Sequence, residues 1–209
     1  MTSRVEEFLS VIGSRSSSKL LEPGRVELND VARALSVAAS APSAHNAQPW
    51  RVIVIDDREV IEKLLDEMGR EWERDLAADG HPPWKIDAIV RESKRRTLRA
   101  ALVIVVCLCM EDMDAYPDER RQGYEYFMAV QSVAAFIENL LLALHAMGYG
   151  ACWRCGPLFA RDAVRRVLSI PPHIDPQALV EVGMPGGTRP KSRKSLSEIA
   201  YRNSWGVPL

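Results

Sequence analysis

The chain contains a stretch, Ala41 to Trp50, that combines small residues, prolines, amides and a hydroxyl group. A helix-period segment precedes it and a β-branched run follows it, so it should form a polar loop at the rim of an apolar core. Amide and hydroxyl groups at such a rim could hold a flat ring rich in heteroatoms. The alternative is an ordinary helix-to-strand connection whose amides bond to their own backbone. The residues placed to contact a ligand are Pro42, Ser43, Ala44, Asn46 and Gln48.

Two cationic segments lie near opposite ends of the chain. A phosphomonoester presents several anionic oxygens, so it requires several charge-assisted donors. The alternatives are a serine-rich surface loop and a solvated basic tail. A nucleic-acid surface is disfavoured, because no aromatic residues alternate with the cations and the formal net charge is -1. The candidate phosphate-binding residues are Arg15, Ser16, Ser17 and Lys19 in the first segment, and Lys191 and Arg193 in the second.

Cys152 and Cys155 have the spacing of a redox pair or of half a zinc site. Zinc would require two further ligands, and no second close Cys/His pair occurs, so we predict no metal site. A thioredoxin-like site should precede a helix, whereas Gly156-Pro157 favours a turn. His45 is the one histidine within a candidate site. It is either a structural residue or a proton donor to a substrate.

The composition indicates a globular protein. Apolar residues make up 47% of 209 residues and charged residues 26%, which predicts one domain over residues 1–209 with a substantial core. Four cysteines in such a chain favour reduced thiols and a cytoplasmic location, and no signal-peptide pattern is visible at the start. The most apolar run, Val130 to Met147, contains Gln131 and Glu138. It therefore reads as a buried helix and not as a membrane span.

Hydrophobic periodicity predicts the elements that position these segments. Because helices and strands are mixed without strict βαβ alternation, the fold class should be α+β. The segment Ala134–Leu144 is apolar nearly all round, so we expect it to be covered on every side, in part by a second subunit. Helices are expected at Val5–Ile12, Glu27–Ser40, Ile61–Leu76, Lys85–Leu98, Tyr124–Met147 and Asp162–Leu168, and strands at Arg51–Ile55, Ala101–Met110, Ala151–Trp153 and Ala178–Met184.

These motifs resemble those of the nitroreductase family of flavin enzymes. The loop matches the family's Pro-Ser-x-x-Asn-x-Gln-Pro-Trp signature in register, from Pro42 to Trp50. The first cationic segment is similar to its Arg-x-Ser-x-Lys/Arg element, with either Ser16 or Ser17 as the phosphate ligand. The second is similar to its Lys-x-Arg element. The resemblance extends from Arg15 to Arg193, with one departure: many relatives have Glu-Gly where this chain has Cys155-Gly156.

The resemblance implies a nitroreductase-like α+β fold with a central mixed sheet flanked by helices, in an intertwined homodimer. It implies FMN at the subunit interface, with the cationic segments of one subunit on the phosphate and part of the Pro42–Gln48 loop supplied by the other. NAD(P)H would reduce the flavin, and a nitroaromatic, quinone or similar acceptor would then take hydride or electrons. The family needs no acid–base side chain, so we assign none. The residues that would line the ring are Trp153, Arg154, Cys155 and Gly156.

Within the family, the greatest similarity is to the C-terminal flavin domain of a bifunctional bacterial protein that makes a deazaflavin coenzyme. It rests on Gly148 to Trp153, Leu158 to Ala160, Asp75 to Gly80 and Tyr116 to Asp118. This similarity adds a dehydro-deazaflavin precursor to the expected acceptors. Two alternatives remain open: a non-catalytic flavin or deazaflavin carrier, and a dehalogenase or flavin-fragmenting member of the superfamily.

Overall fold

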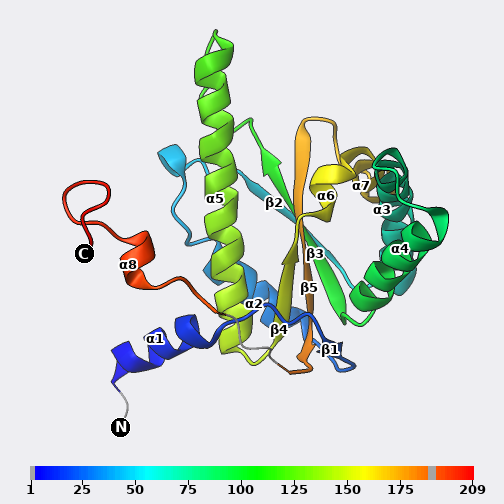
Figure 1. Cartoon of the computed structure of the whole chain (residues 1–209), viewed down its shortest axis with the longest axis horizontal. Coiled ribbons are helices and arrows are strands. Elements are labelled where there is room, and N and C mark those ends of the chain that lie inside the picture. Colours follow the sequence, from blue (N-terminus) through cyan, green and yellow to red (C-terminus); the bar gives the residue numbers. More distant parts are fainter. Residues whose placement is uncertain (1–2, 188–191) are drawn as a thin grey trace.

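A computed structural model describes residues 3–187 and 192–209 of the chain (Figure 1). Most of the expected elements are present, within a few residues of their predicted bounds. Their order is α1 (Arg4–Ser14), β1 (Leu21–Glu22), α2 (Leu28–Ala38), the 3₁₀ turn η1 (Ala44–Asn46), β2 (Trp50–Ile55), α3 (Arg58–Ala78), α4 (Pro83–Thr97), β3 (Leu102–Cys109), α5 (Glu119–Ala146), β4 (Gly150–Arg154), α6 (Gly156–Phe159), α7 (Arg161–Leu168), β5 (Ile174–Pro185) and α8 (Leu196–Ile199).

The five described strands form an antiparallel sheet, which corrects the expectation of a mixed one. β5 pairs with β3 along one edge and with β4 along the opposite edge. The last residues of β5 pair with β1, and β2 pairs with β3. α3 and α4 return the chain to the end of the sheet it left, so Ile55 pairs with Val103 and the two strands are antiparallel. β3 and β4 do run in the same direction, but β5 lies between them. The described strands therefore contain no parallel pair.

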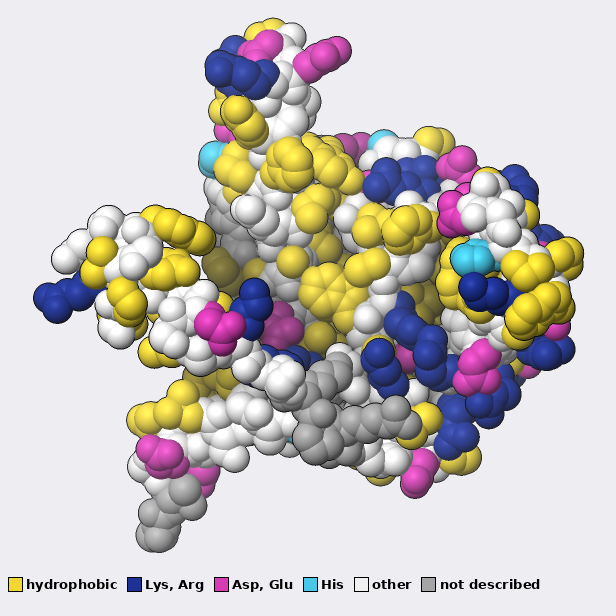
Figure 2. All heavy atoms as spheres, viewed as in Figure 1, with side chains coloured by type: hydrophobic (Ala, Val, Ile, Leu, Met, Phe, Trp, Pro, Cys, Tyr) yellow, Lys and Arg dark blue, Asp and Glu magenta, His cyan; other side chains and the backbone are white. Residues whose placement is uncertain are grey.

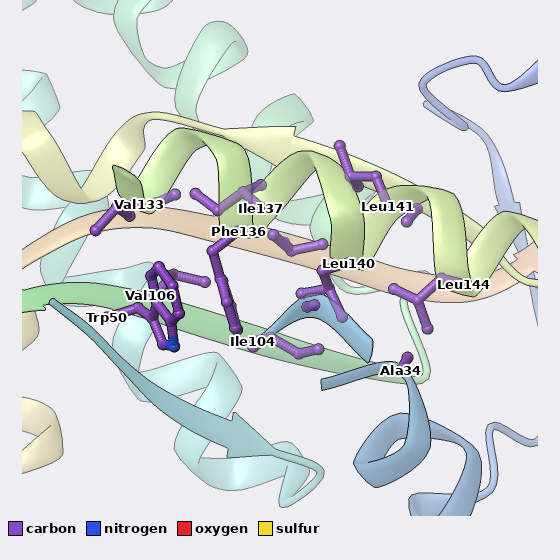
Figure 3. Packing of buried hydrophobic residues seen from close by; sticks show 14 of the residues in the cluster. Ala34, Trp50, Ile104, Val106, Val133, Phe136, Ile137, Leu140, Leu141 and Leu144 are labelled. Atoms are coloured by element: carbon purple, nitrogen blue, oxygen red, sulfur yellow. The ribbon is translucent and has the colours of Figure 1, made fainter. Parts of the chain in front are cut away.

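Both faces of the sheet are covered, and β3 shows why its sequence is apolar throughout. Leu102, Ile104 and Val106 face the cluster beneath α2 and α5, whereas Val103 and Val105 face the cluster beneath α3 and α7. A strand buried on both faces needs no polar alternation. On the α5 face the rings of Trp50 and Phe136 stack with their centroids 5.1 Å apart (Figure 3). The loop signature thus ends in a residue anchored in the core.

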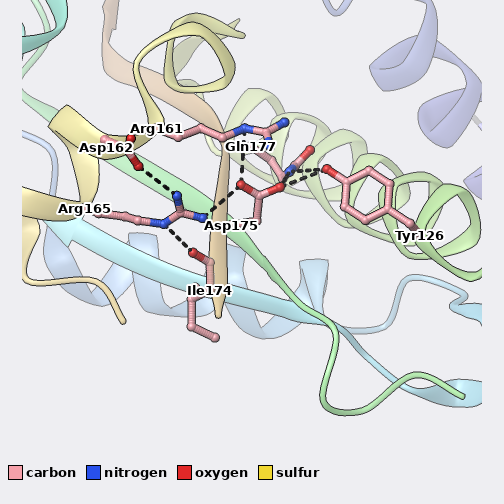
Figure 4. A network of polar contacts seen from close by, with 7 residues as sticks. All are labelled: Tyr126, Arg161, Asp162, Arg165, Ile174, Asp175 and Gln177. Atoms are coloured by element: carbon pink, nitrogen blue, oxygen red, sulfur yellow. Dashed lines mark hydrogen bonds and ion pairs between the residues drawn. The ribbon is translucent and has the colours of Figure 1, made fainter. Parts of the chain in front are cut away.

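β5 begins at Ile174, four residues before the predicted start. Pro176 pairs with Cys107 where the register shifts between Val106 and Cys107, so the proline occupies an irregularity in the ladder. The buried carboxylate of Asp175 also fixes this segment (Figure 4). It accepts hydrogen bonds from the Tyr126 hydroxyl at 2.9 Å and from Gln177 Nε2 at 2.8 Å, which ties α5 to the sheet.

α5 is longer than the sequence predicts, and one chain covers only part of it. It begins at Glu119, because the Asp118 side chain accepts a hydrogen bond from the Arg121 backbone N–H and caps it. By length and composition it could cross a membrane, a property shared with core helices, and 44% of its most apolar stretch is buried. Ala134, Ala135 and Leu142 are half-exposed. One chain therefore leaves part of this helix uncovered, and the expected cover by a second subunit stays a prediction.

Two segments project from the body with apolar side chains exposed (Figures 1 and 2). α1 carries a stripe at helical spacing, and none of its residues is buried. The arm that contains α8 extends away from α5 and includes Trp205, whose exposed fraction is 88%. Because clustered apolar surface is unfavourable in water, these segments indicate a missing contact. Their exposed apolar residues are Val5, Phe8, Leu9 and Ile12 in α1, and Leu196, Ile199, Trp205, Val207 and Leu209 in the arm.

Candidate flavin site

The first cationic segment lies along the free edge of β4. The backbone N–H of Ser18 donates to the carbonyl of Ala151 at 2.9 Å, and Arg15 Nε lies 3.2 Å from Glu138 Oε1 on α5. Burial raises the pKa of the Cys152 thiol, and the positive charge of the nearby Lys19 opposes that rise. A Cβ atom on Gly150 would come within 3.0 Å of the Pro185 backbone and of Ser18, so the close approach requires glycine. Two sequence-distant groups of predicted ligands thus meet at one strand edge.

The end of β4 carries polar groups that lack partners. Trp153 Nε1 and Arg154 Nη2 are buried and have no hydrogen-bond partner among the described residues. The Arg154 guanidinium is held from its other side, because its Nε donates to Glu181 Oε1 at 3.1 Å. Thr97 donates to the same oxygen at 2.6 Å. Since buried donors are nearly always satisfied, these two indicate a ligand with acceptor atoms.

A cavity of about 690 Å³ opens at this strand end. It is within the size range of small-molecule and cofactor sites. Arg154, Cys155 and Gly156, which were predicted to line the flavin ring, line this cavity together with residues of α3 and α4 that the sequence did not indicate. The apolar periodicity of α3 is what core packing alone would produce, so the sequence does not identify Met68 or Trp72 as cavity residues. The further lining residues include Leu65, Met68, Gly69, Trp72, Asp75, Asp79, Val90, Lys94, Thr97 and Phe159.

The Pro42–Gln48 loop holds an unusual backbone conformation. His45, Asn46 and Gln48 have φ values of 54°, 55° and 50°, in the left-handed region that non-glycine residues rarely adopt. The conformation is held by hydrogen bonds from Ala44 N to Ser132 Oγ and from Gln48 N to Ser43 Oγ, each 3.1 Å long. Such strain costs about 1–3 kcal/mol per residue, and strained residues of this kind cluster at functional sites. The geometry therefore agrees with a ligand-contacting loop.

One chain does not bring this loop to the other predicted ligands. The η1 turn lies on one side of α5, and the β4 end with α6 lies on the other (Figure 1). Arg193 is exposed, and its Nη1 donates to the Ser192 carbonyl at 3.2 Å. Lys191 lies outside the described residues. Hence one chain places both Arg15–Lys19 and Trp153–Gly156 on β4 or beside it, and Pro42–Gln48 on the other side of α5.

The four cysteines should differ sharply in reactivity. Burial raises the pKa of Cys107 to about 12, and burial also raises the pKa of Cys152, whereas Cys155 is exposed. A raised pKa keeps a thiol protonated at about pH 8, and the protonated thiol does not attack alkylating reagents. We expect iodoacetamide to modify Cys155 rapidly in the folded protein. Peptide mapping would identify the site, and rapid labelling of Cys107 or Cys152 would contradict the structure.

Comparison with known proteins identifies the family of the chain. The model of the nitroreductase family matches residues 12–184. A "Putative NADH dehydrogenase/NAD(P)H nitroreductase" from Archaeoglobus fulgidus is 29% identical over 185 residues, which cover 87% of each protein.

Solved structures share the fold. A BluB-like flavoprotein from Clostridium difficile superposes with a TM-score of 0.79 at 23% identity, over 94% of this chain and 98% of that one. An iodotyrosine deiodinase bound to FMN and 3-iodo-L-tyrosine gives 0.71 at 20% identity, over 94% and 98%. The chain therefore belongs to the nitroreductase family and has its α+β fold, and it is an oxidoreductase of that family.

Proposed function

We propose that the protein is an FMN-dependent oxidoreductase that uses NAD(P)H to reduce a small conjugated acceptor. The observation that carries this proposal is that β4 holds the cationic segment at its start and, at its end, two buried donors without partners among the described residues and the rim of a cavity. A flavin mononucleotide offers a phosphate for the cations and a ring with several acceptor atoms for the donors. The nitroaromatic, quinone and dehydro-deazaflavin classes remain the candidate acceptors.

The residues present fit FMN. Arg15, Lys19 and the hydroxyls of Ser16 and Ser17 would bind the phosphate, joined by Lys191 and Arg193. The backbone from Trp153 to Gly156 would line the ring edge. Bound FMN would supply hydride acceptance and donation, because none of these side chains can accept or donate a hydride. The chain's own contribution would be to orient the ring, offset the phosphate charge and exclude water with the apolar walls of α3 and α6.

We propose that the site is completed in a homodimer. The half-exposed face of α5, the apolar stripe of α1 and the α8 arm together offer an extended surface for a second copy. Such a partner could bring its Asn46 and Gln48 to the ring, which the fold prevents within one chain. Sedimentation equilibrium should give a dimer. A folded flavin-loaded monomer would refute this part of the proposal.

The function can be tested on the purified protein. We expect it to retain FMN after gel filtration, to oxidise NADH or NADPH with a nitroaromatic or quinone acceptor, and to show slower alkylation of Cys155 when FMN is bound. The Cys155→Ser variant provides the control for the labelling. Tight flavin binding without turnover would favour a carrier. A protein that binds no flavin after incubation with excess FMN would refute the proposal.

The same proposal includes a cytoplasmic location and no nucleic-acid or membrane partner. It is supported by the near-neutral net charge of -1 and by the packing of α5 against the sheet. Fractionation of the producing cells would check it. Recovery of the protein in the membrane fraction at moderate salt would contradict it.

A further inference from the structure

A second cluster of functional side chains lies at the strained loop, on the side of α5 away from the β4 cavity. The carboxylate of Glu125 on α5 is only 2% exposed, and its Oε1 lies 3.5 Å from His45 Nε2. Asp114, in the segment between β3 and α5, places its Oδ2 3.9 Å from the same nitrogen. The three side chains come from three separate parts of the chain, and their ligand atoms lie within 4.8 Å of one another.

Glu125 is the least compensated of the deeply buried acidic side chains described. Glu181 receives hydrogen bonds from Thr97 and Arg154. Asp175 receives them from Tyr126, Gln177 and Arg165. Glu125 Oε2, by contrast, has no hydrogen-bond partner among the described residues. Because a buried carboxylate requires a donor or a cation, this oxygen marks a place where a positively charged ligand would be stabilised.

From this geometry we propose that His45, Asp114 and Glu125 bind one divalent metal ion of the zinc class. One imidazole nitrogen and two carboxylate oxygens suit first-row transition metals. In a tetrahedral site with bonds of about 2.0–2.1 Å, ligand atoms are about 3.4 Å apart. The observed separations of 3.5 and 3.9 Å from His45 Nε2 therefore need only small side-chain rotations.

The exposure of the ligands leaves a route for the ion and an open coordination position. The side chains of His45 and Asp114 are 48% and 61% exposed, whereas Glu125 forms the floor of the site. The backbone at His45 is left-handed, and its imidazole lies 3.5 Å from the Glu125 carboxylate on α5. Metal binding would therefore fasten the η1 turn and the segment before α5 to the helix.

Cobalt(II) provides the test, because its visible absorption reports coordination by protein ligands. We expect EDTA-treated, dialysed protein to bind one Co²⁺ per chain with intensified absorption, which Zn²⁺ displaces. The variants Glu125→Gln and Asp114→Asn should each weaken Co²⁺ binding at least tenfold, by removing a charged ligand. Asp114→Asn changes an exposed side chain, so it keeps the test valid if Glu125→Gln fails to fold.

His173→Gln is the matched control, because His173 Nε2 lies 3.4 Å from Glu111 Oε1 in a pair that is exposed on both sides. It should bind Co²⁺ as the unsubstituted protein does. Absorption no greater than that of the hydrated ion, or unchanged binding by either folded ligand variant, would overturn the proposal. The readout involves neither flavin nor turnover, so its failure is distinct from failure of the oxidoreductase function.

Discussion

The double substitution Arg15→Gln and Lys19→Gln should weaken FMN binding about a hundredfold or more. Each charge-assisted hydrogen bond to a phosphate contributes about 1.5–3 kcal/mol, and about 1.4 kcal/mol corresponds to a tenfold change in affinity. Both side chains belong to the segment that a backbone hydrogen bond of Ser18 fixes against β4. We therefore do not expect another cation to take over their contacts with the phosphate. Fluorescence titration of flavin-free protein with FMN would measure the change.

Riboflavin separates the phosphate contribution from any damage to the ring site. It lacks the phosphate, so the unsubstituted protein and the double variant should bind it with similar affinity. Lys63→Gln, on the exposed face of α3, is the matched control and should leave both affinities unchanged. Equal losses for FMN and riboflavin would show that the two cations support the fold and do not bind the phosphate.

Glu181→Ala should lower the free energy of unfolding by about 2–4 kcal/mol. The substitution would leave the Arg154 guanidinium without its counter-charge and Thr97 Oγ1 with the Ser93 carbonyl as its remaining acceptor. Breaking a buried pair from one side typically costs about 3–5 kcal/mol. We place the expected value somewhat lower because the Arg154 side chain is 25% exposed. Urea denaturation at fixed protein concentration would measure the loss.

Glu92→Ala is the control for this second substitution. Glu92 also accepts hydrogen bonds from an arginine, Arg95, but the pair lies on the exposed face of α4. Solvent screens such pairs, so the control should change stability little. Similar losses of unfolding free energy in the two variants would mean that burial of Glu181 does not determine its contribution to stability. The double variant Glu181→Ala/Arg154→Met should recover part of the loss, because it also removes the uncompensated charge.

Local sequence patterns predicted most elements because their causes are local. The apolar run of β3 indicates a strand covered on both faces, and Asp57 caps α3 by accepting hydrogen bonds from the backbone N–H groups of Glu59 and Val60. The start of β5 was missed because Pro176 argues against a strand, and only the irregular pairing opposite Cys107 accommodates it. The start of α5 was placed too late because the charged turn after Asp118 carries no apolar periodicity.

The sequence by itself determined the α+β class, the family and the chemical character of each candidate segment, since these depend on residue type and spacing along the chain. Only the tertiary structure decided which segments meet. A backbone hydrogen bond places Ser18 against Ala151 and so fixes the Arg15–Lys19 segment beside β4, while α5 lies between Pro42–Gln48 and the end of β4. The approach of His45 to Asp114 and Glu125 likewise results from packing between distant segments. Spacing along a chain carries no information about such a contact.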